Sequence, residues 1–190
     1  MEDFRLLVAQ LGLDMRVSYV AQQRPGGTAR AAAFGIDRAR LEGDVVVALG
    51  ANIFSSTLPA DVTDGLGPDR DGLIITTAVD ASTDGGLGHL PAYVERPEPT
   101  IVAGPHDVNT GRAVTGTGVV DAAALSAFNA DHADRKEQLD LVEFYQQGLD
   151  VGRVDAHEYT GRWFDAGSSH ESLHQAGEHL RNNPPTFWGC

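Results

Sequence analysis

The sequence has little positive charge. Its 190 residues contain 14 Lys and Arg against 27 Asp and Glu, which gives a formal net charge of −13, and Lys136 is the only lysine. A protein that binds nucleic acid in general needs a basic face to neutralise the phosphate backbone. We therefore expect no nucleic-acid partner, and we interpret the excess of carboxylates as a solvated acidic surface.

Cysteine and long apolar runs are also scarce. The one cysteine, Cys190, is the last residue, which excludes an internal disulfide framework and fits a reducing cytoplasm. Residues 1–13 lack the basic start and long apolar stretch of a signal peptide, and no window reaches the length of a transmembrane helix. These absences predict a cytoplasmic protein without a membrane segment.

The composition is that of an ordinary globular protein. Hydrophobic residues make up 42% and charged residues 22% of the chain, so disorder is excluded. The length suits one α/β domain with a sizeable core, and we interpret residues 1–190 as that single domain.

Apolar periodicity predicts alternating helices and strands. The expected strands cover Val17–Ala21, Asp44–Leu49, Leu73–Val79, Ala92–Glu95, Arg112–Val120 and Val151–Glu158. The expected helices cover Phe4–Leu11, Thr28–Arg40, Asp121–Asn129, Arg135–Gln147 and Ser169–Asn182. The β-branched run at 44–49 is typical of a strand buried in a parallel sheet, and the first two strands with the helix between them suggest a βαβ unit. The fold class is therefore α/β, with a mixed, mostly parallel sheet flanked by helices.

Three segments carry recognisable motifs in a defined order. They are Tyr19–Ala31 (YVAQQRPGGTARA), Leu49–Pro59 (LGANIFSSTLP) and Trp163–Leu173 (WFDAGSSHESL). Together they resemble the sugar-1-phosphate nucleotidyltransferases, and within them the glucose-1-phosphate thymidylyltransferases. The resemblance implies a Rossmann-like nucleotidyltransferase fold.

The resemblance also implies binding residues. Gln22, Pro25 and Gly27 stand where the family holds the nucleobase. Asp165 stands at one of the family's two metal-binding aspartates, and we treat it as the candidate catalytic and metal-binding residue. The remaining candidate ligand-binding residues are Gly50 and Asn52 after the second strand, Glu95 and Arg96 in the place of a Glu-Lys-Pro motif, and Val114 in a sugar-pocket strand.

Two departures from the family pattern bear on activity. The family's Gly-x-Gly-Thr-Arg-Leu phosphate loop and its lysine have no counterpart, so this shortened chain lacks the cradle for a triphosphate. Ala51 replaces the other metal-binding aspartate. A single carboxylate holds Mg²⁺ weakly, because Mg²⁺ is usually bound by one or two carboxylates together with substrate phosphates.

These observations predict a nucleotidyltransferase-like protein that has lost nucleotide transfer to sugar 1-phosphates. It would keep or reuse a pocket between Gln22, Gly50–Asn52 and Asp165 for a nucleotide, a sugar nucleotide or another small molecule. Two alternatives stay open. The cleft could perform metal-independent acid–base chemistry, with Asp165, Glu95, His89 or His106 as the proton-transfer group, or the chain could be a half-enzyme completed by a partner polypeptide. Family members are commonly tetramers, so we expect a homo-oligomer.

One further motif has two possible interpretations. Residues 170–174 spell His-Glu-Ser-Leu-His, the pattern of zinc proteases. Ser168 and Glu171 also form a capping-box pattern at the start of a helix, and helix capping explains the segment better than a zinc site does.

Overall fold

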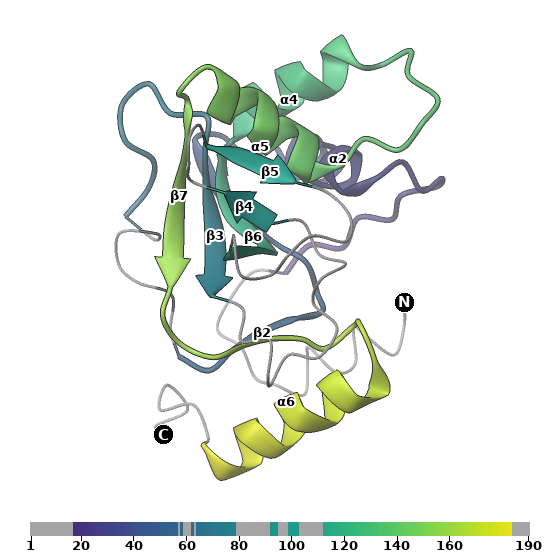
Figure 1. Cartoon of the computed structure of the whole chain (residues 1–190). Helices are drawn as coiled ribbons and strands as arrows, with labels where there is room; N and C mark the ends of the chain where they lie inside the picture. Colours follow the sequence, from purple (N-terminus) through teal and green to yellow (C-terminus); the bar gives the residue numbers. More distant parts are fainter. Residues whose placement is uncertain are drawn as a thin grey trace.

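The computed structural model describes residues 17–56, 58, 62, 64–78, 92–94, 99–102 and 112–183 (Figure 1). Its helices are α2 (Thr28–Ala39), α4 (Ala122–Asp131), α5 (Leu141–Asp150) and α6 (His170–Asn182). Its strands are β1 (Asp44–Ala48), β2 (Asn52–Phe54), β3 (Gly72–Ala78), β4 (Ala92–Val94), β5 (Thr100–Val102), β6 (Arg112–Asp121), β7 (Val154–Tyr159) and β8 (Trp163–Asp165).

Most of these strands form one mixed sheet. Its order is β5-β4-β6-β3-β7, and β1 pairs with β6 beside this path. β2 and β8 form a separate antiparallel pair. Figure 1 shows α2, α4 and α5 gathered at one end of the large sheet and α6 at the opposite end, near β2.

The direction of the strands corrects one expectation. The α/β class and the mixed sheet are confirmed, but among the described pairings only β3 and β7 run parallel, and the other pairings are antiparallel. β1 pairs antiparallel with β6, and Val46 at its centre is 51% exposed. Since β-branched residues favour any strand, the run at 44–49 predicted a strand but not its direction or its depth.

The expected βαβ unit is likewise not formed. Residues 17–22 are described and have no strand structure, so the helix α2 follows an irregular segment. The short run at 17–21 has strand-forming residues, but a strand exists only where a neighbour supplies the hydrogen bonds. The expected opening helix at 4–11 lies outside the described residues.

The other predicted elements have counterparts in the structure, and α5 begins later than predicted. It starts at Leu141 rather than at residue 135. Glu143 Oε1 accepts a hydrogen bond from the Asp140 backbone N–H at 3.3 Å, which is half of a capping box, and this fixes the start of the helix.

β6 is shared by three other strands. One of its edges pairs with β3, and the other pairs first with β4 and then with β1. The change occurs at Gly116, whose φ of 72° lies in the left-handed region, and the register with β3 shifts between Ile74 and Thr76. The resulting β-bulge bends β6, so that one long strand serves two partners on the same edge.

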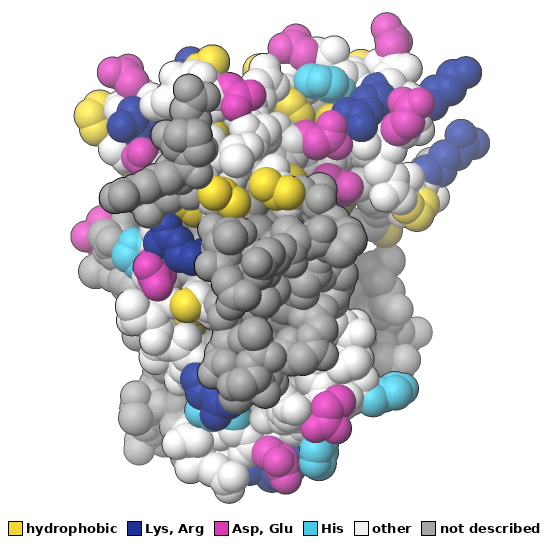
Figure 2. All heavy atoms as spheres, in the orientation of Figure 1, with side chains coloured by type: hydrophobic (Ala, Val, Ile, Leu, Met, Phe, Trp, Pro, Cys, Tyr) yellow, Lys and Arg dark blue, Asp and Glu magenta, His cyan; other side chains and the backbone are white. Residues whose placement is uncertain are grey.

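Two cores cover the two faces of the sheet. The larger lies against α2, α4 and α5 and contains Ile74, Val120, Leu125 and Tyr145, each with at most 2% of its surface exposed. The smaller, on the other face, includes Val62, Ile75, Val119, Tyr159 and Trp163. On the surface shown in Figure 2, basic and acidic side chains are interspersed over the helical end. None of the helices in the described ranges is long and apolar enough to cross a membrane.

Candidate functional site

The paired strands β2 and β8 bring two of the candidate residues together. Their antiparallel register places Asn52 directly opposite Asp165, Ile53 opposite Phe164 and Phe54 opposite Trp163. The Ala166 backbone N–H donates to the Ala51 carbonyl oxygen at 2.9 Å, which continues the pairing by one step. Residues more than a hundred positions apart are thus held side by side at one corner of the fold.

The turn after β8 is held by the backbone of Asp165. Its carbonyl oxygen accepts hydrogen bonds from the hydroxyls of Ser168 at 2.8 Å and Ser172 at 2.6 Å. Its carboxylate accepts only the Gly167 N–H, at 3.3 Å, so one carboxylate oxygen has no partner among the described residues. Asp165 is half-buried and its carboxylate remains available to a ligand.

Asn52 is fixed by hydrogen bonds within the protein. Its Oδ1 accepts from Trp163 Nε1 at 2.8 Å, and its Nδ2 donates to the Leu49 carbonyl oxygen at 3.2 Å. A Cβ placed on Gly116 would lie 3.2 Å from Asn52 Nδ2 and 2.7 Å from Leu49 Cδ1, so the bulge in β6 passes directly behind this amide. The Trp163 contact was not foreseen, because a tryptophan before an aspartate carries no signal of a cross-strand hydrogen bond.

This arrangement does not fit the Mg²⁺ that the family resemblance implies. Ala51 is next to the turn after Asp165, since a Cβ on Gly167 would lie 2.8 Å from the Ala51 Cβ. A methyl group therefore occupies the position expected of the second carboxylate, and the amide of Asn52 is already engaged. Asp165 alone is a poor donor set for an ion that needs near-octahedral oxygen ligands. The described residues contain no group of three or more metal-ligating side chains.

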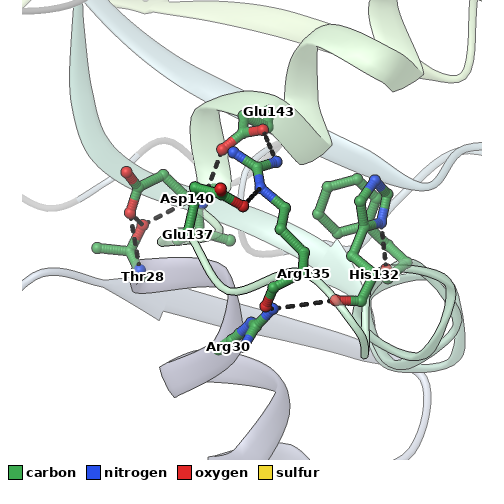
Figure 3. A network of polar contacts seen from close by, with 9 residues as sticks. Thr28, Arg30, His132, Arg135, Glu137, Asp140 and Glu143 are labelled. Atoms are coloured by element: carbon green, nitrogen blue, oxygen red, sulfur yellow. Dashed lines mark hydrogen bonds and ion pairs between the residues drawn. The ribbon is translucent and has the colours of Figure 1, made fainter. Parts of the chain in front are cut away.

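The turn that contains Pro25 and Gly27 is packed against the segment before α5. Figure 3 shows the next residue, Thr28, beside Asp140. The Leu139 backbone N–H donates to the Gly26 carbonyl oxygen, and Leu139 returns a bond by accepting from Ala29 N–H at 3.0 Å. A Cβ on Gly27, whose φ is 96°, would lie 2.3 Å from the Leu139 carbonyl oxygen. Only glycine allows this approach, which explains the Pro-x-Gly pattern by packing.

The helices α2 and α5 begin against each other at this point. Asp140 Oδ1 accepts from the Thr28 backbone N–H at 3.0 Å and from the Thr28 hydroxyl at 3.2 Å. The Thr28 Oγ1 in turn accepts from the Leu141 backbone N–H at 2.9 Å. The N-terminus of α2 is therefore already satisfied by a carboxylate of the protein, and an anion there would have to displace it.

Gln22 does not lie with Asn52 and Asp165 in the structure. It lines a pocket of about 1530 Å³ beside α2, and the lining contains neither Gly50, Asn52 nor Asp165. The sequence predicts one shared pocket for these residues, and a parallel sheet would bring them together at neighbouring strand ends. The antiparallel placement of β1 and the irregular segment before α2 remove the geometry on which that expectation depended.

The other candidate residues have different outcomes. Val114 is 5% exposed, and its side chain belongs to the larger core. Gly50 is exposed, with open space where a Cβ would be. Glu95, Arg96, His89 and His106 lie outside the described residues.

The His-Glu-Ser-Leu-His segment forms the start of α6. Ser169 is the N-cap and its hydroxyl accepts from the Ser172 N–H at 3.0 Å, so the cap lies one residue later than the predicted Ser168. His170 and His174 are exposed, and Glu171 Oε1 accepts from Gln175 Nε2 at 2.9 Å. The segment is a helix start within the described structure.

Comparison with known structures identifies proteins that share this fold. No protein-family model and no curated protein sequence matches the chain. A solved structure assigned as a glucose-1-phosphate thymidylyltransferase from Bacillus anthracis, in complex with sucrose, is similar with a TM-score of 0.75 and 21% identity, over 95% of this chain and 72% of that one. A UDP-glucose pyrophosphorylase complexed with UDP-glucose is similar with a TM-score of 0.65 and 14% identity, over 87% of this chain and 66% of that one. The chain therefore has the fold of the sugar-1-phosphate nucleotidyltransferases.

Proposed function

We propose that this chain binds the sugar part of a small ligand at the β2–β8 corner and does not transfer nucleotides on its own. The observation that carries the proposal is the register that sets Asn52 opposite Asp165 and places the methyl group of Ala51 beside them. The corner thus offers a free carboxylate oxygen without the second carboxylate that metal-assisted transfer would need.

The chemistry of the corner suits hydroxyl groups. Asp165 is an acceptor with free capacity, and Ser168 and Ser169, which follow it in the same turn, are exposed. The turn itself carries no cation, so a phosphate group would meet a carboxylate there, whereas a sugar hydroxyl can donate to it. Both similar structures contain a sugar or a sugar nucleotide, which supports the same class of ligand.

Calorimetry with glucose, dTDP-glucose and UDP-glucose tests the binding part of the proposal. We expect weak binding by the wild type that is lost in Asp165→Ala and retained in Asp150→Ala, because Asp150 lies at the end of α5, where it accepts a hydrogen bond from Gln146 Nε2. Unchanged binding by Asp165→Ala would remove the corner as the binding site.

A pyrophosphate-release assay tests the catalytic part. We expect no release above background from a sugar 1-phosphate with any nucleoside triphosphate and Mg²⁺. Ala51→Asp should raise the affinity for Mg²⁺, since the new carboxylate would stand beside Asp165. Turnover by the wild type that disappears in Asp165→Ala would show that the chain is an active transferase.

We also propose that the chain forms a homo-oligomer. β1 has no second partner among the described strands, and Val46 is 51% exposed on it. An unpaired strand edge with exposed β-branched residues favours association. Light scattering should give a mass above 20.2 kDa, and a monomer at all micromolar concentrations would contradict the proposal.

A further inference from the structure

The exposed face of α6 carries metal-ligating side chains that the proposed sugar-binding corner does not use. His170, His174 and Glu178 follow one another at intervals of four residues, so they form one row along the helix. All three residues are exposed. Figure 2 shows histidine and acidic side chains close to one another over α6, at the lower end of the view. Two kinds of metal ligand, imidazole and carboxylate, therefore share one accessible row.

The two histidines have the spacing of a helical metal-binding pair. Side chains four positions apart on an α-helix have Cβ atoms about 5–6 Å from each other. Two imidazoles placed in this way on one helix face hold Zn²⁺ in metalloproteins. The side chain of His174 is 62% exposed, and His170 is exposed as well. Neither ring is locked in the core, so both can turn toward a common ion.

Glu178 lies beside His174, one turn further along α6. Its Oε1 is 3.6 Å from His174 Nε2, and the Glu178 side chain is 57% exposed. A histidine that binds a metal usually directs its second ring nitrogen to a carboxylate, which orients the ring and makes it a stronger ligand. Glu178 is placed to do this for His174.

Helix capping does not account for the histidines. The cap joins the Ser169 hydroxyl to the Ser172 N–H and involves neither imidazole. Glu171, which would be the general base of a zinc protease, accepts a hydrogen bond from Gln175 Nε2 at 2.9 Å. The described part of the chain also contains no group of three metal-ligating side chains. A protease centre is therefore not formed, and the histidine pair needs another explanation.

We propose that His170 and His174 bind a divalent transition-metal ion such as Zn²⁺ or Cu²⁺, with Glu178 as the carboxylate that orients His174. Imidazole nitrogen suits Zn²⁺, Cu²⁺ and Ni²⁺, whereas Mg²⁺ prefers oxygen ligands. The net charge of −13 favours the approach of a cation. This inference goes beyond the sugar-binding function and uses no residue of the β2–β8 corner.

The site should bind more weakly than a structural zinc centre. Such a centre has four protein ligands, whereas this pair supplies two and water completes the coordination. His170 also lies in the first turn of α6, where the positive end of the helix dipole disfavours a cation. Both effects lower the affinity, and neither changes the preference for imidazole-binding metals.

Calorimetry with ZnCl₂ and CuCl₂ on the full chain without an affinity tag tests the proposal. Every protein in the series carries Cys190→Ser, because the thiolate of the last residue is itself a metal ligand. We expect His170→Gln and His174→Gln each to weaken Zn²⁺ binding by at least about tenfold, since each removes one of two ligands. Glu178→Gln should weaken it by about tenfold through the orientation of His174.

Glu171→Gln is the matched control for Glu178→Gln. It removes the same charge from the same helix, but the Glu171 carboxylate bonds to Gln175 rather than facing a histidine. It should leave the affinity for Zn²⁺ unchanged. Thermal unfolding without metal should give the same midpoint for all these exposed substitutions, which separates loss of the site from loss of the fold.

Several results would overturn the proposal. They are Zn²⁺ binding that His170→Gln leaves unchanged, equal effects of the two glutamate variants, and no binding of Zn²⁺ or Cu²⁺ at millimolar concentration. Displacement of Zn²⁺ by an equal concentration of Mg²⁺ would also do so, because it would show general attraction to acidic side chains. Sugar binding that is absent while Zn²⁺ binding depends on both histidines would remove only the sugar-binding function.

Discussion

The two ends of the molecule are built differently. At the helical end, α5 buries Leu141, Phe144, Tyr145, Gly148 and Leu149 against the large core. At the opposite end, α6 buries only Ala176, and its Leu173 is 54% exposed. The helical end is stabilised by burial of apolar surface in the larger core, whereas α6 buries little and the turn before it is held by hydrogen bonds to the Asp165 carbonyl oxygen.

This difference separates folding from binding. Apolar contacts at the helical end contribute most of the stability, since burial is the dominant favourable term in folding. The serines and histidines at the start of α6 are mostly exposed and contribute less, so their identity can be changed with little effect on the fold. Substitutions at the helical end should therefore lower the stability of the fold, whereas substitutions at the β2–β8 corner should mainly change ligand binding.

The largest expected contrast is between a core aromatic and an exposed leucine. Phe144→Ala should lower the free energy of unfolding by about 3–5 kcal/mol, because it leaves a cavity in the large core. Leu173→Ala should change it by less than about 0.5 kcal/mol. Urea unfolding followed by circular dichroism measures both, and similar losses would show that α6 belongs to the same cooperative core.

A glycine pair gives the next contrast. Gly27→Ala should destabilise by about 1–3 kcal/mol, because its φ is 96° and a Cβ would meet the Leu139 backbone at 2.3 Å. Gly35→Ala, in the middle of α2 with nothing within 4 Å of its Cβ position, should stabilise by about 0.5–1 kcal/mol. Thermal unfolding of the two variants should shift in opposite directions; a shared sign would contradict the close packing of the turn.

The caps of α2 and α6 provide a third comparison. Asp140→Ala should cost about 2 kcal/mol, since it removes the acceptor of Thr28 at the start of α2 and disturbs the start of α5. Ser169→Ala should cost about 0.5–1 kcal/mol, and the loss should appear mainly as faster amide exchange in the first turn of α6. Equal global losses would mean that α6 unfolds with the rest.

The smallest effect concerns Tyr145 and has a definite pH dependence. Burial raises the pKa of its hydroxyl, which has no hydrogen-bond partner among the described residues. The folded state then holds this proton more tightly than the unfolded state. The contribution of the protonated hydroxyl to the free energy of unfolding is therefore complete at neutral pH, and it is lost as pH rises above the unfolded pKa of about 10.

Tyr145→Phe removes the unsatisfied hydroxyl and this titration together. We expect stability at neutral pH to be unchanged or higher by up to about 1 kcal/mol. Above pH of about 10, the variant should lose less stability than the wild type. Urea midpoints at neutral and alkaline pH measure the difference. A clear loss at neutral pH would show that the hydroxyl has a partner in solution, such as a buried water.

Local patterns predicted much of this architecture, and contacts between distant residues account for the differences. The ranges of α2, β3, β6 and α6 follow from apolar spacing and caps, which depend on nearby residues. The direction of β1 depends on which distant strand it meets, and no local pattern specifies that choice. The start of α5 depends on Asp140 and Glu143, a capping box that apolar periodicity overlooks.

The structure brings only some of the candidate residues together, for the same reason. The neighbourhood of Asn52 and Asp165 agrees with the order of the motifs, because both lie at the ends of short strands that pair. Gln22 and Val114 were grouped with them by sequence resemblance, but the described structure places one beside α2 and the other in the core.

The position of β6 in the chain has a consequence for synthesis on the ribosome. β1 and β3 both obtain their antiparallel partner from β6, which ends at Asp121. A nascent chain that has not yet released this residue from the exit tunnel exposes the Val45–Val47 run and the Leu73–Ile75 run without partners. Short apolar β-branched segments of this kind aggregate readily. The emerging chain therefore exposes both runs until β6 leaves the exit tunnel, and the exposure ends when that one strand arrives.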